Sequence, residues 1–114
     1  MTLVEQITWV DVCDVDDLAI DRGACALVDG RQIAVFRVAP SGELFALSNF
    51  DPFSGAYVLS RGIVGSRGDV VKVASPVYKQ SFDLRTGQCL DDPAVTVETF
   101  PVRSVDGRVL VGVP

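Results

Sequence analysis

The side chains in this sequence with the most reactive chemistry are three cysteines, and the chain has no histidine. Cys13, Cys25 and Cys89 show no Cys-x-x-Cys spacing and are odd in number, so they predict neither a zinc site nor a disulfide framework. The lack of histidine excludes a Ser/His or Cys/His nucleophilic pair. The carboxylates of Asp16-Asp17 and Asp91-Asp92 are adjacent in sequence and would point to opposite faces of a strand, which favours turn or cap roles over acid–base pairs. No catalytic residues are therefore expected in this chain.

Two segments combine proline or glycine with aromatic and polar residues, and we term them loop one and loop two. Loop one is residues 49–56 (NFDPFSGA), and loop two is residues 74–82 (ASPVYKQSF). Their oxygen donors Asp51, Ser75 and Tyr78 amount to one carboxylate and two neutral hydroxyls, a poor site for a hard cation such as Mg²⁺. We therefore expect no metal here. We expect Asp51 and Ser75 to hydrogen-bond loop backbone instead, as such side chains do in turns.

The two loops resemble the cluster-binding loops of Rieske proteins, which carry Cys-x-His in the first loop and Cys-x-x-His in the second. Loop two also runs into FDLRTGQCL, similar to the strand and Thr-Gly turn that follow the second His in that family. The resemblance implies that Asp51 and Phe53 stand at the first pair of lost ligand positions, and Ser75 and Tyr78 at the second. Because a Rieske centre needs two thiolates and two imidazoles, no cofactor is expected in this chain. A vacated hole costs stability, so we expect Phe53 and Tyr78 to fill it.

Three segments are similar to one subgroup of Rieske-like proteins, the small subunits of assimilatory NAD(P)H-dependent nitrite reductases. These segments are residues 51–56 (DPFSGA), 59–65 (LSRGIVG) and 74–80 (ASPVYKQ). The resemblance implies a non-catalytic small subunit that docks on and supports a large subunit carrying FAD, an iron–sulfur cluster and sirohaem. In this family the large subunit reduces nitrite to ammonia in nitrate assimilation, so the nitrite chemistry is expected to belong to the partner.

Five loop residues are candidates for the partner interface: Phe50, Phe53, Tyr78, Lys79 and Gln80. Lys79 and Gln80 are expected at the tip of loop two, next to the place where Rieske proteins meet redox partners, and a solvated lysine is an equally good interpretation. Phe50 and Phe53 fit either an exposed apolar anchor or, preferably, a small core beneath the loops. Two other functions stay open: a Rieske-type ferredoxin-like electron carrier, which needs a cluster, and a stand-alone binding module on the same fold.

Length and charge narrow the class of protein further. At 114 residues the chain is expected to form one domain over residues 1–114. Its net charge of −5 argues against nucleic acid and against an anionic membrane as partners, because both recruit basic patches. No apolar run reaches the about 18 residues of a membrane span, and residues 1–6 lack the basic and apolar regions of a signal peptide. Together with the few scattered cysteines, this leads us to expect a place in the reducing cytoplasm.

Apolar and alternating runs separated by turn residues predict the strands that must position the two loops. Asp29-Gly30 and Asp106-Gly107 predict tight hairpins, residues 14–18 a short turn of helix with an Asp cap, and residues 49–69 a loop-rich stretch. The expected strands are residues 7–12, 23–28, 32–38, 43–48, 63–64, 69–74, 81–84 paired with 89–90, 95–100, 102–105 and 108–111. The pattern predicts the all-β class: a Rieske-like antiparallel sandwich or barrel with a small loop-rich subdomain, corresponding to the cluster-binding region, at about residues 49–92.

Overall fold

A computed structural model describes residues 6–114, so residues 1–5, on which the signal-peptide argument largely rests, lie outside the described residues. The described chain consists of short β-strands joined by turns and by two 3-10 helices, η1 (Val15–Asp17) and η2 (Leu59–Arg61). The prediction of an all-β protein is confirmed. The strands are β1 (Thr8–Asp14), β2 (Arg22–Val28), β3 (Arg31–Val38), β4 (Glu43–Ser48), β5 (Phe50–Asp51), β6 (Ala56–Tyr57), β7 (Ile63–Arg67), β8 (Val70–Ala74), β9 (Ser81–Asp83), β10 (Thr99–Phe100), β11 (Val102–Val105) and β12 (Arg108–Val113).

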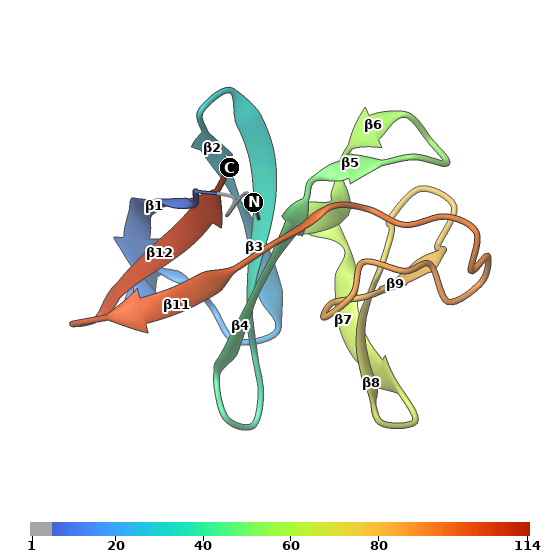
Figure 1. Ribbon diagram of the computed structural model, residues 1–114. Helices are drawn as coiled ribbons and strands as arrows, with labels where there is room; N and C mark the ends of the chain where they lie inside the picture. The colour runs from blue at the N-terminus through green and yellow to red at the C-terminus, as the bar shows by residue number, and fades with distance from the viewer. Residues whose placement is uncertain (1–5) are drawn as a thin grey trace, which may run out of the picture.

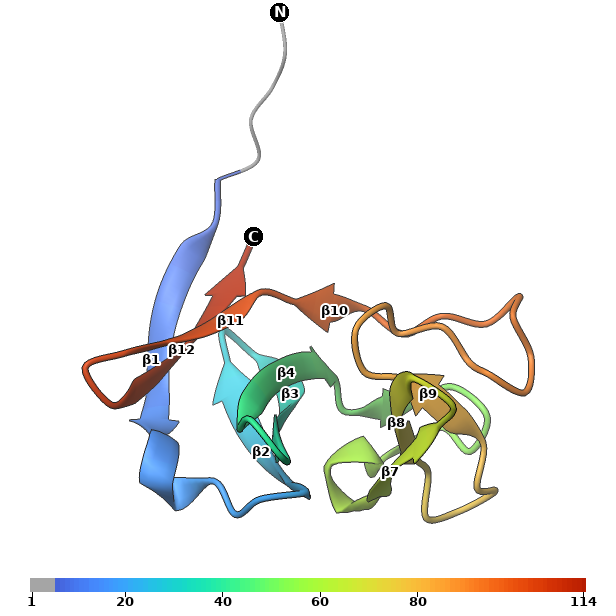
Figure 2. The same ribbon diagram turned by 90° about the horizontal axis from the view of Figure 1, so that it is seen from below.

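The strands pair into antiparallel sheets that fall into two groups (Figure 1). The first group contains a three-stranded sheet in the order β1–β12–β11 and a four-stranded sheet in the order β10–β4–β3–β2. The second contains the hairpin β5–β6 and the three-stranded sheet β7–β8–β9, and it carries both loops. Figure 2 shows β2, β3 and β4 between the β1–β12–β11 sheet on one side and β7, β8 and β9 on the other.

The middle layer exists because β3 and β4 are apolar on both faces. Successive side chains of a strand point to opposite faces, and in β3 the side chains of Ile33 and Val35 join one buried core while those of Ala34 and Phe36 join another. A run of consecutive apolar residues is the pattern expected of a strand covered on both sides. The first core also contains Leu18, Val28, Ala46, Phe100, Val109, Val111 and Val113, and the second also contains Val38, Phe45, Leu47, Leu59, Val73, Phe82, Leu84, Cys89 and Val97.

Two hairpin turns and one short helix form where the sequence predicts them. The turns Asp29-Gly30, between β2 and β3, and Asp106-Gly107, between β11 and β12, hold both residues at positive φ, from 50° to 78°. Such two-residue turns match the twist of the strands that they join. Asp14 occupies the N-cap position of η1, and its backbone N–H donates to Asp17 Oδ2 at 3.2 Å, but the Asp14 side chain makes no cap hydrogen bond.

The structure differs from the predicted strands in three places. Residues 89–90 do not form a strand: they meet β9 only through an isolated bridge between Phe82 and Cys89, because β9 pairs along its length with β8. Residues 95–98 are not part of a named strand, and β10 is limited to Thr99–Phe100. The reason is that their backbone partners lie in different parts of the fold: Val97 N–H donates to Gly87 O, while Glu98 O accepts from Ser48 N–H of β4. Conversely, the loop-rich stretch contains the hairpin β5–β6, which the sequence pattern did not predict because each strand has only two residues. Over residues 6–114, none of the helices has the length and apolar character needed to cross a membrane.

Gly87 is the glycine whose replacement tests how the second group is held in place. A Cβ added at Gly87 would lie 2.1 Å from the backbone oxygen of Val97, and the residue has a φ of 78°. Gly107 has the same φ of 78° but open space around its Cα. We therefore expect Gly107→Ala to lower the free energy of unfolding by about 1 kcal/mol, the cost of the left-handed backbone, and Gly87→Ala by about 3 kcal/mol. Urea denaturation of both variants measures the difference, and equal losses would contradict the close packing of Gly87.

Candidate functional site

A hydrogen bond between two buried side chains joins loop one to loop two. Asp51 and Ser75 have exposed fractions of 0% and 1%, and Ser75 Oγ donates to Asp51 Oδ2 at 2.5 Å. This length is typical of a hydroxyl bound to a carboxylate, which is about twice as strong as a neutral hydrogen bond. The sequence predicted that both residues bond loop backbone, and the structure adds that they bond each other.

The second oxygen of Asp51 organises loop one. Asp51 Oδ1 accepts from the backbone N–H groups of Phe53 at 2.9 Å and Ser54 at 3.4 Å, and Asp51 O accepts from Gly55 N–H. In loop two, the backbone N–H of Val77 donates to Ser75 Oγ. The carboxyl of Asp51 therefore has donors on both oxygens, which a buried charge requires.

The hydrogen bonds also determine the ionisation of Asp51. Burial by itself raises the pKa of this carboxyl, but the hydroxyl of Ser75 and the backbone N–H groups of Phe53 and Ser54 outweigh it and hold the pKa below the ordinary value of 3.8. Asp51 is therefore an anion at neutral pH. A carboxylate with this environment is suited to hold loops together and not to act as a general base.

The two aromatic side chains expected to fill the space between the loops have different positions. Phe53 is partly buried, packs against the second core and lies with its ring centre 6.1 Å from that of Phe82. This agrees with a core beneath the loops. Tyr78 does not fill the space: its exposed fraction is 63%, so the prediction for Tyr78 was wrong. The physical reason is that Phe53, together with the Asp51–Ser75 pair, already occupies the interior between the loops.

The other candidate interface residues divide between the surface and the interior. Lys79 is exposed at the tip of loop two and has a positive φ of 65°. Phe50 lies on β5, and its ring is 5.1 Å from that of Tyr57, whose exposed fraction is 55%. Gln80 is partly buried, and its Oε1 has no hydrogen-bond partner within the described chain. The loops thus expose Tyr78 and Lys79, whereas Phe50 is half-buried beside Tyr57 and Phe53 packs inward.

Sequence reasoning missed Asn49, the buried residue that attaches loop one to the middle sheet. Its exposed fraction is 2%, and its Nδ2 donates to Tyr57 O at 3.1 Å and to Gln32 Oε1 at 3.3 Å. Asn49 Oδ1 accepts from Ser60 N–H at 2.7 Å. These bonds fix β3, β6 and η2 to one another. The signal in the sequence is the polar pair Ser48-Asn49 placed directly after the apolar run of residues 44–47.

The cysteines and carboxylates do not assemble a reactive centre in the described part of the chain. Cys89 is buried, and burial raises the pKa of the Cys13 and Cys25 thiols, so these two thiols stay protonated at neutral pH. Between residues 6 and 114, no three His, Cys, Asp or Glu side chains gather closely enough to hold a metal ion.

Comparison with known proteins identifies the family. Residues 8–112 match the Rieske-like [2Fe-2S] domain. The nitrite reductase (NADH) small subunit of Escherichia coli K12 is 42% identical over 101 residues, which are 89% of this chain and 94% of that protein. A crystal structure described as an NADH-dependent nitrite reductase small subunit from Mycobacterium tuberculosis has 46% identity and a TM-score of 0.93, covering 96% of this chain and 98% of that one. This chain belongs to the family of nitrite reductase small subunits.

A further relative contains the same domain as part of a longer chain. The nitrite reductase [NAD(P)H] large subunit of Klebsiella oxytoca is 40% identical to this chain over 104 residues, which are 91% of this chain and 11% of that protein. The small-subunit family therefore has a counterpart that is covalently joined to a large subunit.

The loops of this chain do not fit the iron–sulfur cluster that the domain family implies. Cluster ligation requires thiolates and imidazoles, whereas the chain has no histidine and neither loop one nor loop two contains a cysteine. Asp51 and Ser75 are bonded to each other, and Phe53 is packed in the core. The chain thus has the Rieske-like fold, and its two loops are joined by a hydrogen bond between their own side chains.

The Asp51–Ser75 bond is expected to contribute measurably to stability. Ser75→Ala leaves one oxygen of a buried carboxylate without its donor, so we expect a loss of about 2 kcal/mol in the free energy of unfolding. In a double-mutant cycle with Asp51→Asn, the coupling free energy should be about 1 kcal/mol or more. A coupling near zero would contradict a bond between the loops.

The same variants give a pH dependence with a defined sign. Because the pKa of Asp51 is lower in the folded state than its ordinary value of 3.8, the unfolded chain binds the proton first on acidification. The stability that the ionised carboxyl contributes is complete above pH 3.8 and is lost as the pH falls through the folded-state pKa. The stability difference between wild type and Asp51→Asn should therefore be constant near neutral pH and shrink below about pH 4, as measured by urea denaturation.

Phe53 and Tyr78 form a matched pair for testing the space between the loops. Phe53→Ala removes a ring from the edge of the core, and we expect a loss of about 2 kcal/mol, or a fall in melting temperature of roughly 10 °C. Tyr78→Ala removes an exposed ring and should change stability by less than about 0.5 kcal/mol. Calorimetry of the two variants measures both melting temperatures. A melting temperature of Phe53→Ala equal to that of wild type would refute the packing role of Phe53.

Proposed function

We propose that this chain is the non-catalytic small subunit of a cytoplasmic NAD(P)H-dependent nitrite reductase, which reduces nitrite to ammonia in nitrate assimilation. In this proposal it docks on and supports a large subunit that carries FAD, an iron–sulfur cluster and sirohaem. The observation that carries the proposal is the Klebsiella oxytoca large subunit, in which a segment 40% identical to this chain is part of the same polypeptide. A domain that is fused to a large subunit in one organism is a good candidate for its non-covalent partner in another.

The geometry of the loops supports a docking role. Val77 and Tyr78 at the tip of loop two have exposed fractions of 44% and 63%, and exposed Lys79 follows them. An exposed aromatic ring beside an apolar residue and a cation is a common composition of an interface centre. The buried Asp51–Ser75 bond holds the base of this loop, so little conformational entropy is lost when the tip binds a partner.

An electron-carrier role has weaker support than a docking role. Such a role requires a redox group in this chain, and the loop positions that correspond to cluster ligands carry no thiol and no imidazole. A stand-alone binding module on the same fold remains a different outcome of the experiment below, because such a module would bind no large subunit.

The proposal predicts a stable complex with the large subunit from the same organism. We expect the purified proteins to elute together in size-exclusion chromatography and the chain to raise the melting temperature of the large subunit, because a partner that binds the folded state stabilises it. We also expect the double variant Tyr78→Ala/Lys79→Ala to bind at least tenfold more weakly, a loss of about 1.4 kcal/mol. Biolayer interferometry measures the affinity, and NADH-dependent consumption of nitrite measures the effect on activity.

Val105→Ala is the matched control for these loop variants. Val105 is also exposed, at 43%, but it ends β11 at the opposite end of the molecule from loop two (Figure 1). Its replacement should leave the affinity within about twofold of wild type. Absence of any complex with an active large subunit would refute the proposed function, and equal losses in the loop and control variants would refute the docking face.

A further inference from the structure

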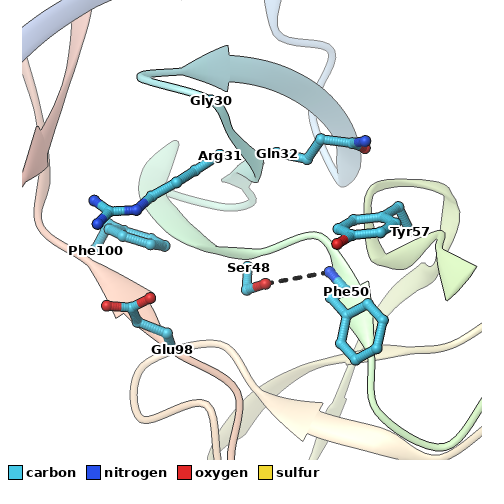
Figure 3. Close-up of a pocket in the computed structure, with 8 residues that line it drawn as sticks. All are labelled: Gly30, Arg31, Gln32, Ser48, Phe50, Tyr57, Glu98 and Phe100. Atoms are coloured by element: carbon cyan, nitrogen blue, oxygen red, sulfur yellow. Dashed lines mark hydrogen bonds between the residues drawn. The ribbon is translucent and has the colours of Figure 1, made fainter. Parts of the chain in front are cut away.

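A pocket of about 270 Å³ lies where the β5–β6 hairpin meets the middle sheet (Figure 3). It is lined by the β2–β3 turn and the start of β3, the end of β4, the hairpin itself, and the segment leading into β10. Phe50 and Tyr57 pair across the hairpin and line this pocket, whereas the next pair in register, Asp51 and Ala56, does not line it. The pocket therefore shares Phe50 with loop one and lies at the start of that loop. Its lining residues are Gly30, Arg31, Gln32, Ser48, Phe50, Tyr57, Glu98 and Phe100.

The pocket wall contains one charged group with an unsatisfied hydrogen-bond donor, the guanidinium of Arg31. Its Nη1 is shielded from water and has no hydrogen-bond partner within residues 6–114. Other arginines of the described chain, such as Arg67, Arg85 and Arg108, are paired with carboxylates at 2.7–3.3 Å, and Arg31 is in none of these ion pairs. Buried donors in folded proteins are nearly always bonded. A carboxylate that enters the pocket meets a guanidinium already partly stripped of water, so pairing costs less further desolvation.

The other side chains that line the pocket determine which kind of ligand its carboxylate can belong to. The rings of Phe50 and Tyr57 meet edge to face at 5.1 Å and form an apolar wall. Ser48 Oγ accepts the Phe50 backbone N–H at 3.3 Å, which fixes the hydroxyl at the pocket and leaves its proton to donate (Figure 3). Glu98 lines the same pocket, and within residues 6–114 it forms no ion pair with Arg31. Its negative charge disfavours a small free anion and favours a ligand with N–H groups beside its carboxylate.

A peptide segment with an acidic side chain meets all of these conditions. Its carboxylate pairs with Arg31, its backbone N–H groups face Glu98, and a neighbouring apolar side chain contacts the ring of Tyr57. The volume of about 270 Å³ is about nine times the roughly 30 Å³ that a water molecule takes in the liquid, which is room for one such side chain with part of its backbone. Elsewhere the net charge of −5 repels an acidic segment, so charge complementarity directs it to Arg31.

We infer that this pocket receives an acidic side chain of the large subunit, as a second contact next to the tip of loop two. The inference rests on the proposed function, because it names the chemistry of the partner segment that the small subunit recognises. Arg31 is the residue that determines this recognition, and Phe50 and Tyr57 provide the apolar wall beside it.

Binding of Arg31→Met to the purified large subunit tests the inference, since methionine keeps an unbranched stem and removes the charge and the donors. We expect at least a tenfold weaker Kd, and a smaller loss of affinity between 50 mM and 300 mM NaCl than for wild type. The matched control is Arg22→Met, which removes the same charge at the other end of the β2–β3 hairpin, where Arg22 of β2 lies opposite Arg37 of β3 in the strand register. Its Kd should stay within twofold of wild type, and unchanged melting temperatures exclude misfolding of either variant.

A photo-crosslinking amino acid in place of Tyr57 identifies the occupant directly. In the complete complex we expect it to capture a peptide of the large subunit that contains Asp or Glu. If wild type binds the large subunit and Arg31→Met binds equally well, or if the captured peptide has no acidic residue, the inference about the pocket is wrong and the proposed function stands. If wild type itself does not bind, the proposed function and the inference both fail.

Discussion

The burial of both faces of β3 and β4 is the constraint on which the arrangement of this molecule depends. Phe36 and Leu47, both with an exposed fraction of 0%, face the second group of strands. Removing that cover would expose several large apolar side chains, each at a cost of about 1.5–3 kcal/mol. The strands β5 to β9 must therefore stay against the middle sheet. The two loops that they carry are fixed in space for the same reason.

The loops themselves are closed by polar contacts in place of a metal centre. Residues 8–112 match the Rieske-like [2Fe-2S] domain, and in this chain Asp51 of loop one and Ser75 of loop two bond each other. A single charge-assisted hydrogen bond is worth only about 1.5–3 kcal/mol, which is modest for a cross-link between loops. Asn49 and Phe53 add to it, since one bonds three neighbouring elements and the other packs on the core. The scaffold thus keeps its shape by distributing the cross-link over several weaker contacts.

This arrangement separates the structural charges from those available to a partner. Arg108 pairs with Asp11 and Asp14 across β1 and β12, and Arg85 pairs with Glu43, so the charges of these cations are already matched within the chain. Lys79 and Arg31, which form no ion pair in the described chain, lie at loop two and at the pocket beside loop one. Both positions are in the part of the molecule that carries the exposed rings of Tyr57 and Tyr78. The loop end of the molecule therefore combines exposed rings with cations that no carboxylate of the described chain pairs.

The sequence by itself determined the all-β class, the Asp-Gly hairpins and the family. Turn residues act locally, because the positive φ of the Asp29-Gly30 turn depends on the residue types alone. The family is indicated by the amino-acid motifs of the two loops, which can be read directly in the sequence. It also predicted that Phe53 lies over a core. The tertiary structure alone decided that Tyr78 points to solvent, that residues 95–98 pair with two different parts of the fold, and that Arg31 meets Phe50 and Tyr57 in one pocket. These outcomes depend on residues distant in sequence competing for the same space and the same hydrogen-bond partners, and such competition is settled only when the whole chain is packed.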